Sequence, residues 1–77
     1  MFNTIKINGK DVDYKRLNKC INGNPRYFFH YTEFSCDYNE ALQMVRKIGG
    51  VKYRGKNYKG FVISSHNLER DLKQIIN

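Results

Sequence analysis

The sequence has no tryptophan, a single proline and only two cysteines. Of these three features, the small number of cysteines excludes the most classes of protein. Cys20 and Cys36 lack the C-x-x-C spacing of metal and redox sites, and the chain starts without a charged region followed by an apolar run. Neither a disulfide-dense secreted scaffold nor a signal peptide is therefore indicated. We expect two free thiols in a cytoplasmic protein, with a single Cys20–Cys36 bridge as the alternative.

Long apolar runs and recognisable catalytic motifs are missing as well. No segment approaches the roughly 18 apolar residues that identify a membrane-spanning helix. The only histidines are His30 and His66. Neither has a Cys, Ser or carboxylate at a spacing that would make that residue its catalytic partner. Asp11 and Asp13 could hold a metal or act as acid and base, but two carboxylates near a turn are commonplace. We therefore expect no enzyme, no metal site and no cofactor.

The glycines do not form a phosphate-binding loop of the Walker type. The stretch GGVKYRGKNYKG, residues 49–60, lacks the Gly-Lys-Ser/Thr ending of such a loop and precedes a strand pattern instead of a helix. Its glycines are better explained as a helix end at Gly49 and Gly50 and as hairpin turns at Gly55 and Gly60.

Acidic residues are scarce, and basic residues are abundant. Fourteen Lys and Arg oppose seven Asp and Glu, which gives a net charge of +7. Residues 39–77 carry eight of the basic residues and three of the acidic ones. A basic excess in one region favours a polyanionic partner, although it says nothing about the fold. At 77 residues we expect one small domain, residues 1–77.

The first half of the chain has the pattern of antiparallel strands. Alternating isoleucines lead to Asn8-Gly9, the pair that best tolerates a type I′ turn, so residues 3–14 predict a hairpin. A second turn signal at residues 21–26, which contains the only proline, separates two β-prone segments that should pair. Aromatic residues alternate onto both faces of residues 27–34, which predicts a central strand.

The second half alternates between helical and extended patterns. Residues 38–48 predict a helix that starts at Ser35 or Asp37 as cap and ends at Gly49. Its apolar stripe contains Ala41, Leu42, Val45 and Ile48. Residues 50–65 then predict strand, turn and strand, with Gly55-Lys56-Asn57 at the reversal.

A second helix is predicted to follow Ser65 or Asn67 as cap. Its apolar stripe contains Leu68, Leu72, Ile75 and Ile76. The order β-β-β-α-β-β-α predicts an α+β fold with two layers, in which a mainly antiparallel sheet buries both helices on one face. The opposite face is then available, as it is in several small nucleic-acid-binding modules.

The strongest functional signal is the stretch RKIGGVKYRGKNYKG, residues 46–60, which holds six basic residues, no acidic residue and two tyrosines. Several phosphates could be neutralised by these cations, which come from the end of the helix and from the predicted hairpin: Arg46, Lys47, Lys52, Arg54, Lys56 and Lys59. The interleaved Tyr53 and Tyr58 could stack on bases. Further cations could join if the sheet brings them alongside: Arg16, Lys19 and Arg26.

An alternative interpretation of the same stretch needs no ligand. The cations could simply cover a solvent face while Tyr53 and Tyr58 pack beneath them on Leu42 and Leu72. Arg46 and Lys47 would also suit the negative end of a helix dipole.

Two quoted segments carry a resemblance to a known group of proteins. NGNPRYFFHY and KIGGVKYRGKNYKGFVISSHNLERDL, within residues 21–72, resemble small proteins encoded by phages and mobile elements. These have an N-G-N-P-R-Y turn and strand, a K-Y-R-G-K hairpin and an S-x-N-L-E helix start. The resemblance implies no catalytic activity. It implies an accessory role, since small proteins of this origin often bind DNA or RNA, or inhibit a host defence protein.

The leading hypothesis is a small basic accessory protein that binds DNA or RNA through residues 46–59, with dominant phosphate contacts and little sequence specificity. The alternative hypothesis is an inhibitor or adaptor that binds a host protein through the aromatic strand 27–34 or through the same basic surface. Either a monomer or a homodimer paired through an open sheet edge is consistent with the pattern.

Overall fold

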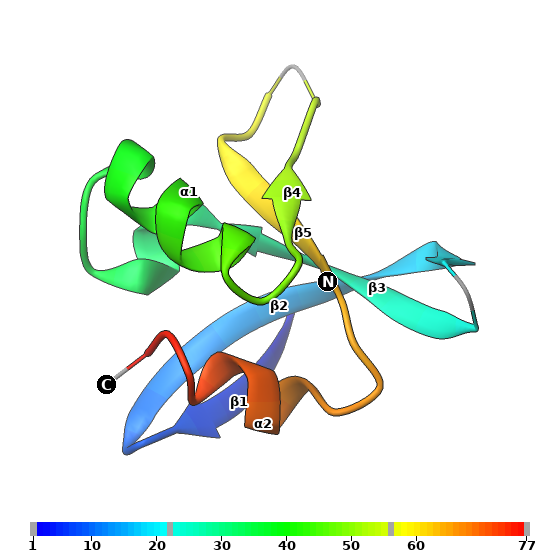
Figure 1. The fold of residues 1–77 in the computed structure, drawn as a ribbon, viewed down its shortest axis with the longest axis horizontal. Helices are drawn as coiled ribbons and strands as arrows, with labels where there is room; N and C mark the ends of the chain where they lie inside the picture. The colour runs from blue at the N-terminus through cyan, green and yellow to red at the C-terminus, as the bar shows by residue number, and fades with distance from the viewer. Residues whose placement is uncertain (1, 22, 56, 77) are drawn as a thin grey trace.

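A computed structural model describes residues 2–21, 23–55 and 57–76, with the side chains of residues 18–21 left out. Five strands form one antiparallel sheet in the order β1-β2-β3-β5-β4, accompanied by two α-helices and one 3-10 helix (Figure 1). The elements are β1 (Asn3–Ile7), β2 (Lys10–Ile21), β3 (Asn24–His30), η1 (Tyr31–Phe34), α1 (Tyr38–Arg46), β4 (Val51–Lys52), β5 (Gly60–Ser64) and α2 (Leu68–Leu72). The predicted α+β fold class is therefore confirmed.

The β1–β2 hairpin follows from its turn sequence. Asn8 and Gly9 both have positive φ, 50° and 83°, as a type I′ turn requires. Ile7 consequently pairs with Lys10 across a two-residue loop. The hairpin predicted for residues 3–14 is confirmed.

Strand β3 lies in the middle of the sheet, as predicted, but it spans Asn24–His30 and not residues 27–34, so Pro25 lies in the strand and not in the turn predicted for residues 21–26. Residues 31–34 form η1, because the ring of His30 accepts a hydrogen bond from the backbone N–H of Thr32 and Ser35 adopts a left-handed conformation with φ 56°. The backbone N–H of Tyr31 donates to the carbonyl of Lys59 at 3.0 Å. The chain therefore turns away from the sheet after His30.

Helix α1 begins where its cap predicts. Asp37 Oδ1 accepts the backbone N–H of Glu40 at 2.9 Å, and this bond satisfies one of the unpaired donors at the helix start. The helix ends at Arg46, two residues before the predicted end, and a turn carries the chain to Gly49 at φ 82°. Ala41 and Val45 are fully buried, whereas Leu42 is half-buried.

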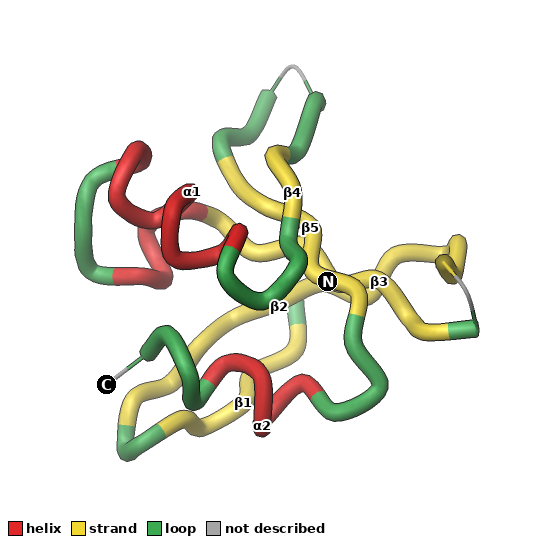
Figure 2. The backbone as a smooth tube through the Cα atoms, viewed as in Figure 1, coloured by secondary structure: helices red, strands yellow, loops and turns green. Residues whose placement is uncertain are grey.

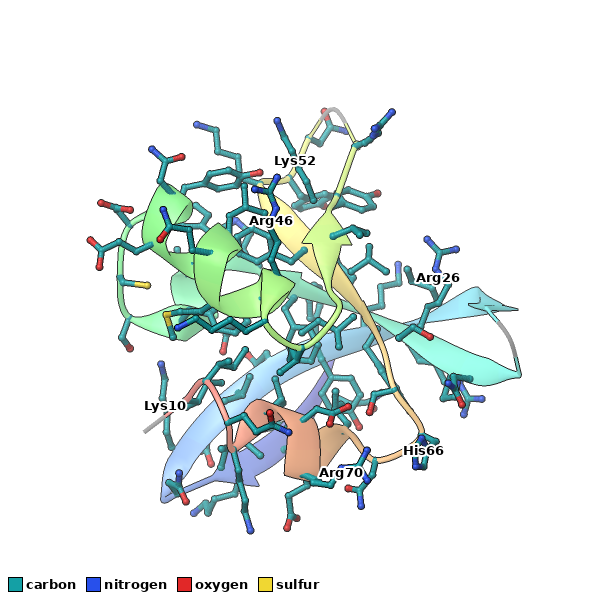
Figure 3. All side chains as sticks on the ribbon, in the orientation of Figure 1. Lys10, Arg26, Arg46, Lys52, His66 and Arg70 are labelled. Atoms are coloured by element: carbon teal, nitrogen blue, oxygen red, sulfur yellow. The ribbon has the colours of Figure 1, made fainter. Side chains whose placement is uncertain are left out.

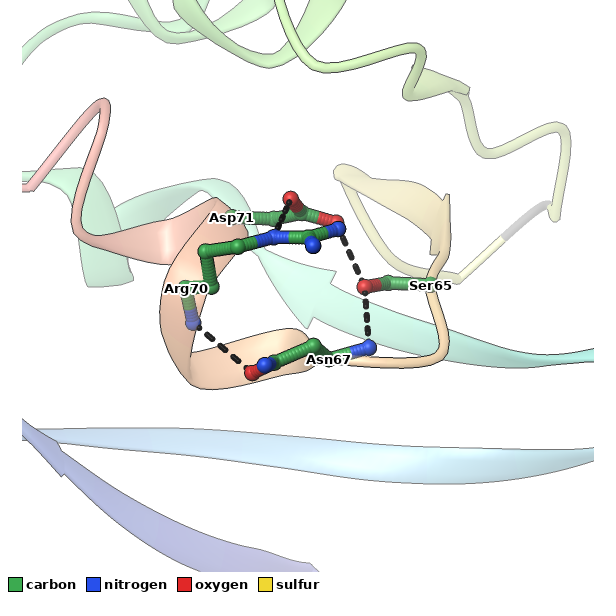
Figure 4. Close-up of polar contacts among 4 residues, drawn as sticks. All are labelled: Ser65, Asn67, Arg70 and Asp71. Carbon is green, nitrogen blue, oxygen red and sulfur yellow. Dashed lines mark hydrogen bonds and ion pairs between the residues drawn. The ribbon is translucent and has the colours of Figure 1, made fainter.

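Helix α2 is held by a small polar network at its start (Figure 4). Asn67 Oδ1 accepts from the backbone N–H of Arg70 at 3.1 Å, and Ser65 Oγ accepts from the N–H of Asn67 at 3.0 Å. Ser65 Oγ also donates to Asp71 Oδ2 at 2.5 Å. The buried Ser65 hydroxyl is thus satisfied. The predicted stripe is confirmed as buried: Leu68, Leu72, Ile75 and Ile76.

One face of the sheet carries the main core. Phe29, Phe61 and Ile63 point from the central strands into a cluster that also contains buried residues of both helices. Figure 2 shows α1 beside β4 and β5 and α2 beside β1, in agreement with their contacts. The two helices therefore share one side of the sheet, and the predicted two-layer arrangement is confirmed.

The β4–β5 segment departs from the predicted strand, turn and strand. Regular pairing covers only Val51–Lys52 and the facing part of β5, plus a hydrogen bond from the N–H of Tyr53 to the carbonyl of Gly60 at 2.9 Å. Beyond it the chain forms a loop that projects from the molecule (Figure 1), in which Lys56 lies outside the described residues. Gly55 lies against the ring of Tyr53, so the chain bends there instead of staying extended. Arg54 and Lys59 are therefore loop residues, not strand residues as predicted.

Cys36 is a half-buried free thiol, and the side chain of Cys20 lies outside the described residues. Burial raises the pKa of the Cys36 thiol, and the carboxylates of Glu40 and Asp37 raise it further, against a smaller lowering by Lys10. Neither described helix has the length and apolar character needed to cross a membrane.

Candidate nucleic-acid interface

Basic and acidic residues occupy different parts of the sequence, and the sheet brings the basic parts together. Residues 14–32 and 41–68 contain ten of the fourteen basic residues and none of the seven acidic ones. The first range covers most of β2 and all of β3, and the second covers β4 and β5. Because the order is β2-β3-β5-β4, these acid-free segments are neighbours in the sheet, and the two acidic residues of β2, Asp11 and Asp13, lie in the part of the strand that pairs with β1. The acidic residues are left to the β1–β2 hairpin, η1 and the helices.

The outer face of the sheet, opposite the two helices, is built on a row of paired residues. Lys15, Phe28, Val62 and Val51 are successive cross-strand partners from β2 to β4, and so their side chains share one face. Phe28 and Val62 are only 5% and 6% exposed, although they are not part of the core cluster beneath the helices. Side chains other than those of the helices must therefore cover them.

Three further aromatic rings provide that cover. The ring centroids of Tyr53, Tyr58 and Phe2 lie 4.7, 6.1 and 6.3 Å from the centroid of Phe28. We call these four residues the aromatic cluster. Its outer members stay accessible, with Phe2 47% and Tyr58 57% exposed. The aromatic cluster thus has a buried member at its centre and exposed members at its outside.

The aromatic cluster corrects one interpretation of the sequence. Tyr53 and Tyr58 were expected, if they did not contact a ligand, to pack on Leu42 and Leu72. Leu42 and Leu72 belong to the core on the helix side of the sheet, whereas both tyrosines pack on Phe28 on the outer face. The alternation along β4 explains the difference, because Val51 and Tyr53 face outward while Lys52, the partner of Phe61, does not.

Cations surround the β4 edge of the sheet. Arg26, two residues before Phe28 on the same face of β3, shares a depression of about 370 Å³ with Lys52 and Arg54. Lys52 also lines a second depression of about 670 Å³ together with Lys59, on the side of the start of α1. Lys52 therefore borders both sides of the edge strand.

The helix end contributes to the same region. Arg46 and Lys47 are exposed at the C-terminal end of α1, which packs beside β4. Figure 3 shows Arg26, Arg46 and Lys52 pointing toward the end of the molecule from which the β4–β5 loop projects, with His66 and Arg70 at the opposite end. We call the six cations around this edge the basic band: Arg26, Arg46, Lys47, Lys52, Arg54 and Lys59.

The remaining predicted cations are placed differently. Arg16 pairs with Tyr27 and so lies on the helix side of β2, away from the outer face. Lys19 and Lys56 have side chains outside the described residues. The cations that the structure brings together therefore form a band around an edge, and not one flat hairpin surface.

The basic band is electrostatically uncompensated. Among the described residues, the ion pairs are Lys6–Asp11, Arg70–Asp71 and Lys73–Glu69, and none includes a member of the band. In addition, the Nε of Arg26 is buried without an acceptor in the described part of the chain.

The carboxylates considered for catalysis have structural partners. Asp13 Oδ1 accepts the hydroxyl hydrogen bond of Thr4 at 2.7 Å, and Asp11 lies 3.8 Å from the ammonium of Lys6. Both are cross-strand pairs of the β1–β2 hairpin. Within residues 2–21, 23–55 and 57–76, no three His, Cys, Asp or Glu side chains are grouped closely enough to hold a metal ion.

Two members of the site were not found by sequence reasoning. Phe2 and Lys15 line a depression of about 100 Å³ with Phe28 and the two tyrosines. A signal for Phe2 does exist in the sequence, because a type I′ turn at Asn8-Gly9 fixes the hairpin register and places Asn3 opposite Tyr14. Extending that register by one residue brings Phe2 next to Lys15.

A match to a protein-family model relates this chain to phage proteins. The model of the Staphylococcus phage terminal repeat-encoded protein TreK matches residues 5–77. The chain belongs to this family. Membership of the TreK family confirms the resemblance to phage-encoded small proteins, and the match covers the whole basic band and all of the aromatic cluster except Phe2. No curated protein and no solved structure matches the chain.

Proposed function

We propose that this member of the TreK family binds nucleic acid through the basic band, with phosphate contacts dominant and little sequence specificity. The observation that carries the proposal is the segregation of charge. Ten of the fourteen cations and no carboxylate lie in residues 14–32 and 41–68, which contain most of β2, all of β3, β4 and β5, the β4–β5 loop and the C-terminal part of α1. Such a region concentrates positive potential and attracts a polyanion.

The shape of the band favours a phosphate backbone as the ligand. Cations come from the end of α1, from the edge strand, from the loop and from the outer face, so they are spread around an edge and not gathered in one pocket. A spread of this kind matches charges repeated along a chain, whereas a protein interface depends on a few buried anchors. The proposed role is binding without catalysis, in the cytoplasm where the nucleic acid is accessible.

Binding to fluorescein-labelled oligonucleotides, measured by fluorescence anisotropy at several salt concentrations, tests the proposal. If five to six phosphates are neutralised, the log–log slope of the binding constant against salt should be about −5 on duplex DNA and nearer −4 on single strands. The double variant Arg54→Gln/Lys59→Gln should weaken binding to all sequences alike and flatten the slope by about two units.

The matched control is Lys6→Gln/Lys73→Gln, which lowers the net charge equally but removes cations that are already paired with Asp11 and Glu69. Its slope should stay within about half a unit of the parent chain. If no oligonucleotide binds at low salt, or if both double variants lose affinity equally, the proposal is wrong. The phage-type inhibitor or adaptor of a host protein is then the remaining candidate. In strand 27–34 it would have to use the half-buried Tyr27 and Tyr31 as anchors, since Phe28, Phe29 and Phe34 are buried.

A further inference from the structure

The outer face of the sheet offers something that phosphate contacts alone do not use. The aromatic cluster exposes about half of Phe2 and more than half of Tyr58, on a face that neither helix covers. Large apolar side chains that are exposed next to one another can form a surface that binds a partner. The third exposed apolar side chain among the described residues, Val51 at 57%, lies on the same face.

The exposed rings are held in place by buried ones. Phe28 is 5% exposed at the centre of the cluster, and Tyr53 contacts it at 4.7 Å between centroids with the ring planes 65° apart. Gly60 beneath Phe28 permits this position, because a Cβ there would lie 2.7 Å from a ring carbon of Phe28. Phe2 and Tyr58 thus rest on a fixed base and lose little conformational freedom when they contact a ligand.

The cations border the exposed rings. Lys15 lines the same depression as Phe2 and Tyr58, and Arg26 and Arg54 line the next depression, which shares Tyr53 with the first. Aromatic rings that alternate with cations suit a ligand that presents flat apolar groups and negative charges in alternation. Single-stranded nucleic acid is such a ligand, because its bases are unpaired and free to stack on protein rings, and its phosphates follow one another.

A duplex would leave these rings without a role. Its bases are stacked inside the helix, so Phe2 and Tyr58 could touch only the backbone or a groove edge. We propose that the ligand is single-stranded nucleic acid, whose bases stack on Phe2 and Tyr58 while the basic band holds the phosphates. This inference rests on the proposed function. It adds that the ligand is single-stranded and that Phe2 and Tyr58 contact its bases.

The test compares oligonucleotides with and without exposed bases. The probes are labelled 12-nucleotide oligo-dT, oligo-U and a 12-base-pair DNA duplex, measured by anisotropy at one low salt concentration. The variant Phe2→Leu/Tyr58→Leu keeps an apolar cover over Phe28 and every charge, but it removes both exposed rings. Its affinity for single strands should fall about 10-fold or more, while its affinity for the duplex changes less than about two-fold.

Three controls separate stacking from general disruption. Tyr58→Phe keeps the ring and should retain wild-type affinity for single strands, whereas Val51→Ala removes an exposed apolar side chain that cannot stack and should also bind normally. Thermal unfolding of each variant should stay close to that of the parent, since Phe2, Val51 and Tyr58 are largely exposed. Oligo-dT and oligo-U together show whether the strand is DNA or RNA.

The outcomes distinguish this inference from the proposed function. Equal binding of duplex and single strands, unchanged in Phe2→Leu/Tyr58→Leu, overturns the stacking inference and leaves the basic band as a phosphate-binding surface. An equal loss in Val51→Ala also overturns it, because apolar contact and not stacking then explains the effect. Absence of binding to all three probes overturns both proposals.

Discussion

At the scale of single residues, Gly60 controls how β5 lies against β3. A Cβ at this position would lie 2.2 Å from the carbonyl oxygen of Phe29 and 2.7 Å from the ring of Phe28. The carbonyl belongs to the backbone of the paired strand and cannot rotate away. Gly60 was predicted as a turn residue, but it is buried at the first position of β5, opposite His30. Its role is close approach of two strands, not reversal of the chain.

Gly60→Ala should therefore destabilise the protein. We expect overpacking to lower the free energy of unfolding by about 1–3 kcal/mol. The substitution also makes the unfolded chain less flexible, but this effect stabilises the protein by only about 0.4–1 kcal/mol. Urea unfolding followed by circular dichroism measures the change. Ser64→Ala, in the same strand, is the control and should stay within about 0.5 kcal/mol of the parent chain. An unchanged midpoint for Gly60→Ala would show that the two strands can separate without cost.

The candidate site shows which residue-level features were predictable. The cations of residues 46–59 were identified from the sequence because charge is a property of each residue taken alone. The aromatic cluster was not identified, because Phe28 meets Tyr53 and Tyr58 only after β3 and the β4–β5 segment have paired through β5. Phe28 is about 25 to 30 positions from the two tyrosines in sequence, so no local pattern predicts these contacts.

At the scale of elements, the two helices bury their stripes unequally. Leu72 of α2 is fully buried in the core between the helices and the sheet, whereas Leu42 of α1 is half-buried at its border. Ala41 and Val45 take the fully buried positions of α1 instead. The apolar stripe identified the correct face of α1, but packing against η1 and β5 decided which of its members lie deepest.

This difference predicts the outcome of two otherwise identical substitutions. Leu72→Ala should lower the free energy of unfolding by about 2–5 kcal/mol, because the cavity left in the core is enclosed on all sides. Leu42→Ala should cost clearly less, since water can reach part of the space that the side chain leaves. Thermal and urea unfolding of both variants provide the comparison. Equal losses would mean that Leu42 is as enclosed as Leu72.

At the scale of the whole molecule, a net charge of +7 is confined to a body of 28 × 27 × 25 Å. The Debye length is about 30 Å at 0.01 M salt and about 10 Å at 0.1 M. Charges on opposite sides of the protein therefore repel one another at low salt but not at 0.1 M. The three described ion pairs are exposed and offset little of this repulsion.

Added salt should accordingly stabilise the free protein. We expect Tm to rise by several degrees between 0.01 and 0.1 M sodium chloride and to change little beyond that range, since each 1 kcal/mol moves Tm by about 4–8 °C in a domain of this size. Differential scanning fluorimetry or circular dichroism measures the shift. Arg54→Gln/Lys59→Gln should show a smaller shift than Lys6→Gln/Lys73→Gln, because only the first pair removes unpaired cations. A Tm that falls with salt would show that attraction, not repulsion, dominates.

Features that depend on neighbouring residues could be predicted from the amino-acid pattern. Asn8-Gly9 determined the first hairpin, two cap candidates placed the start of each helix to within two residues, and the spacing of apolar residues determined which helix faces are buried. Each of these depends on backbone conformation or hydrogen bonds within a few positions of the chain. The excess of basic residues is likewise a property of composition.

The arrangement of those elements depends instead on contacts that the folded chain makes between distant residues. The tertiary structure extended the pairing of β3 with β5 beyond His30, where Tyr31 bonds to Lys59 from a distant part of the chain. It turned Tyr53 and Tyr58 onto Phe28, and it arranged the cations as a band around the β4 edge. The physical reason is the same in each case. Strand order and register bring residues into contact that are far apart in sequence, and the energies of those contacts then exceed the local preferences that the sequence displays.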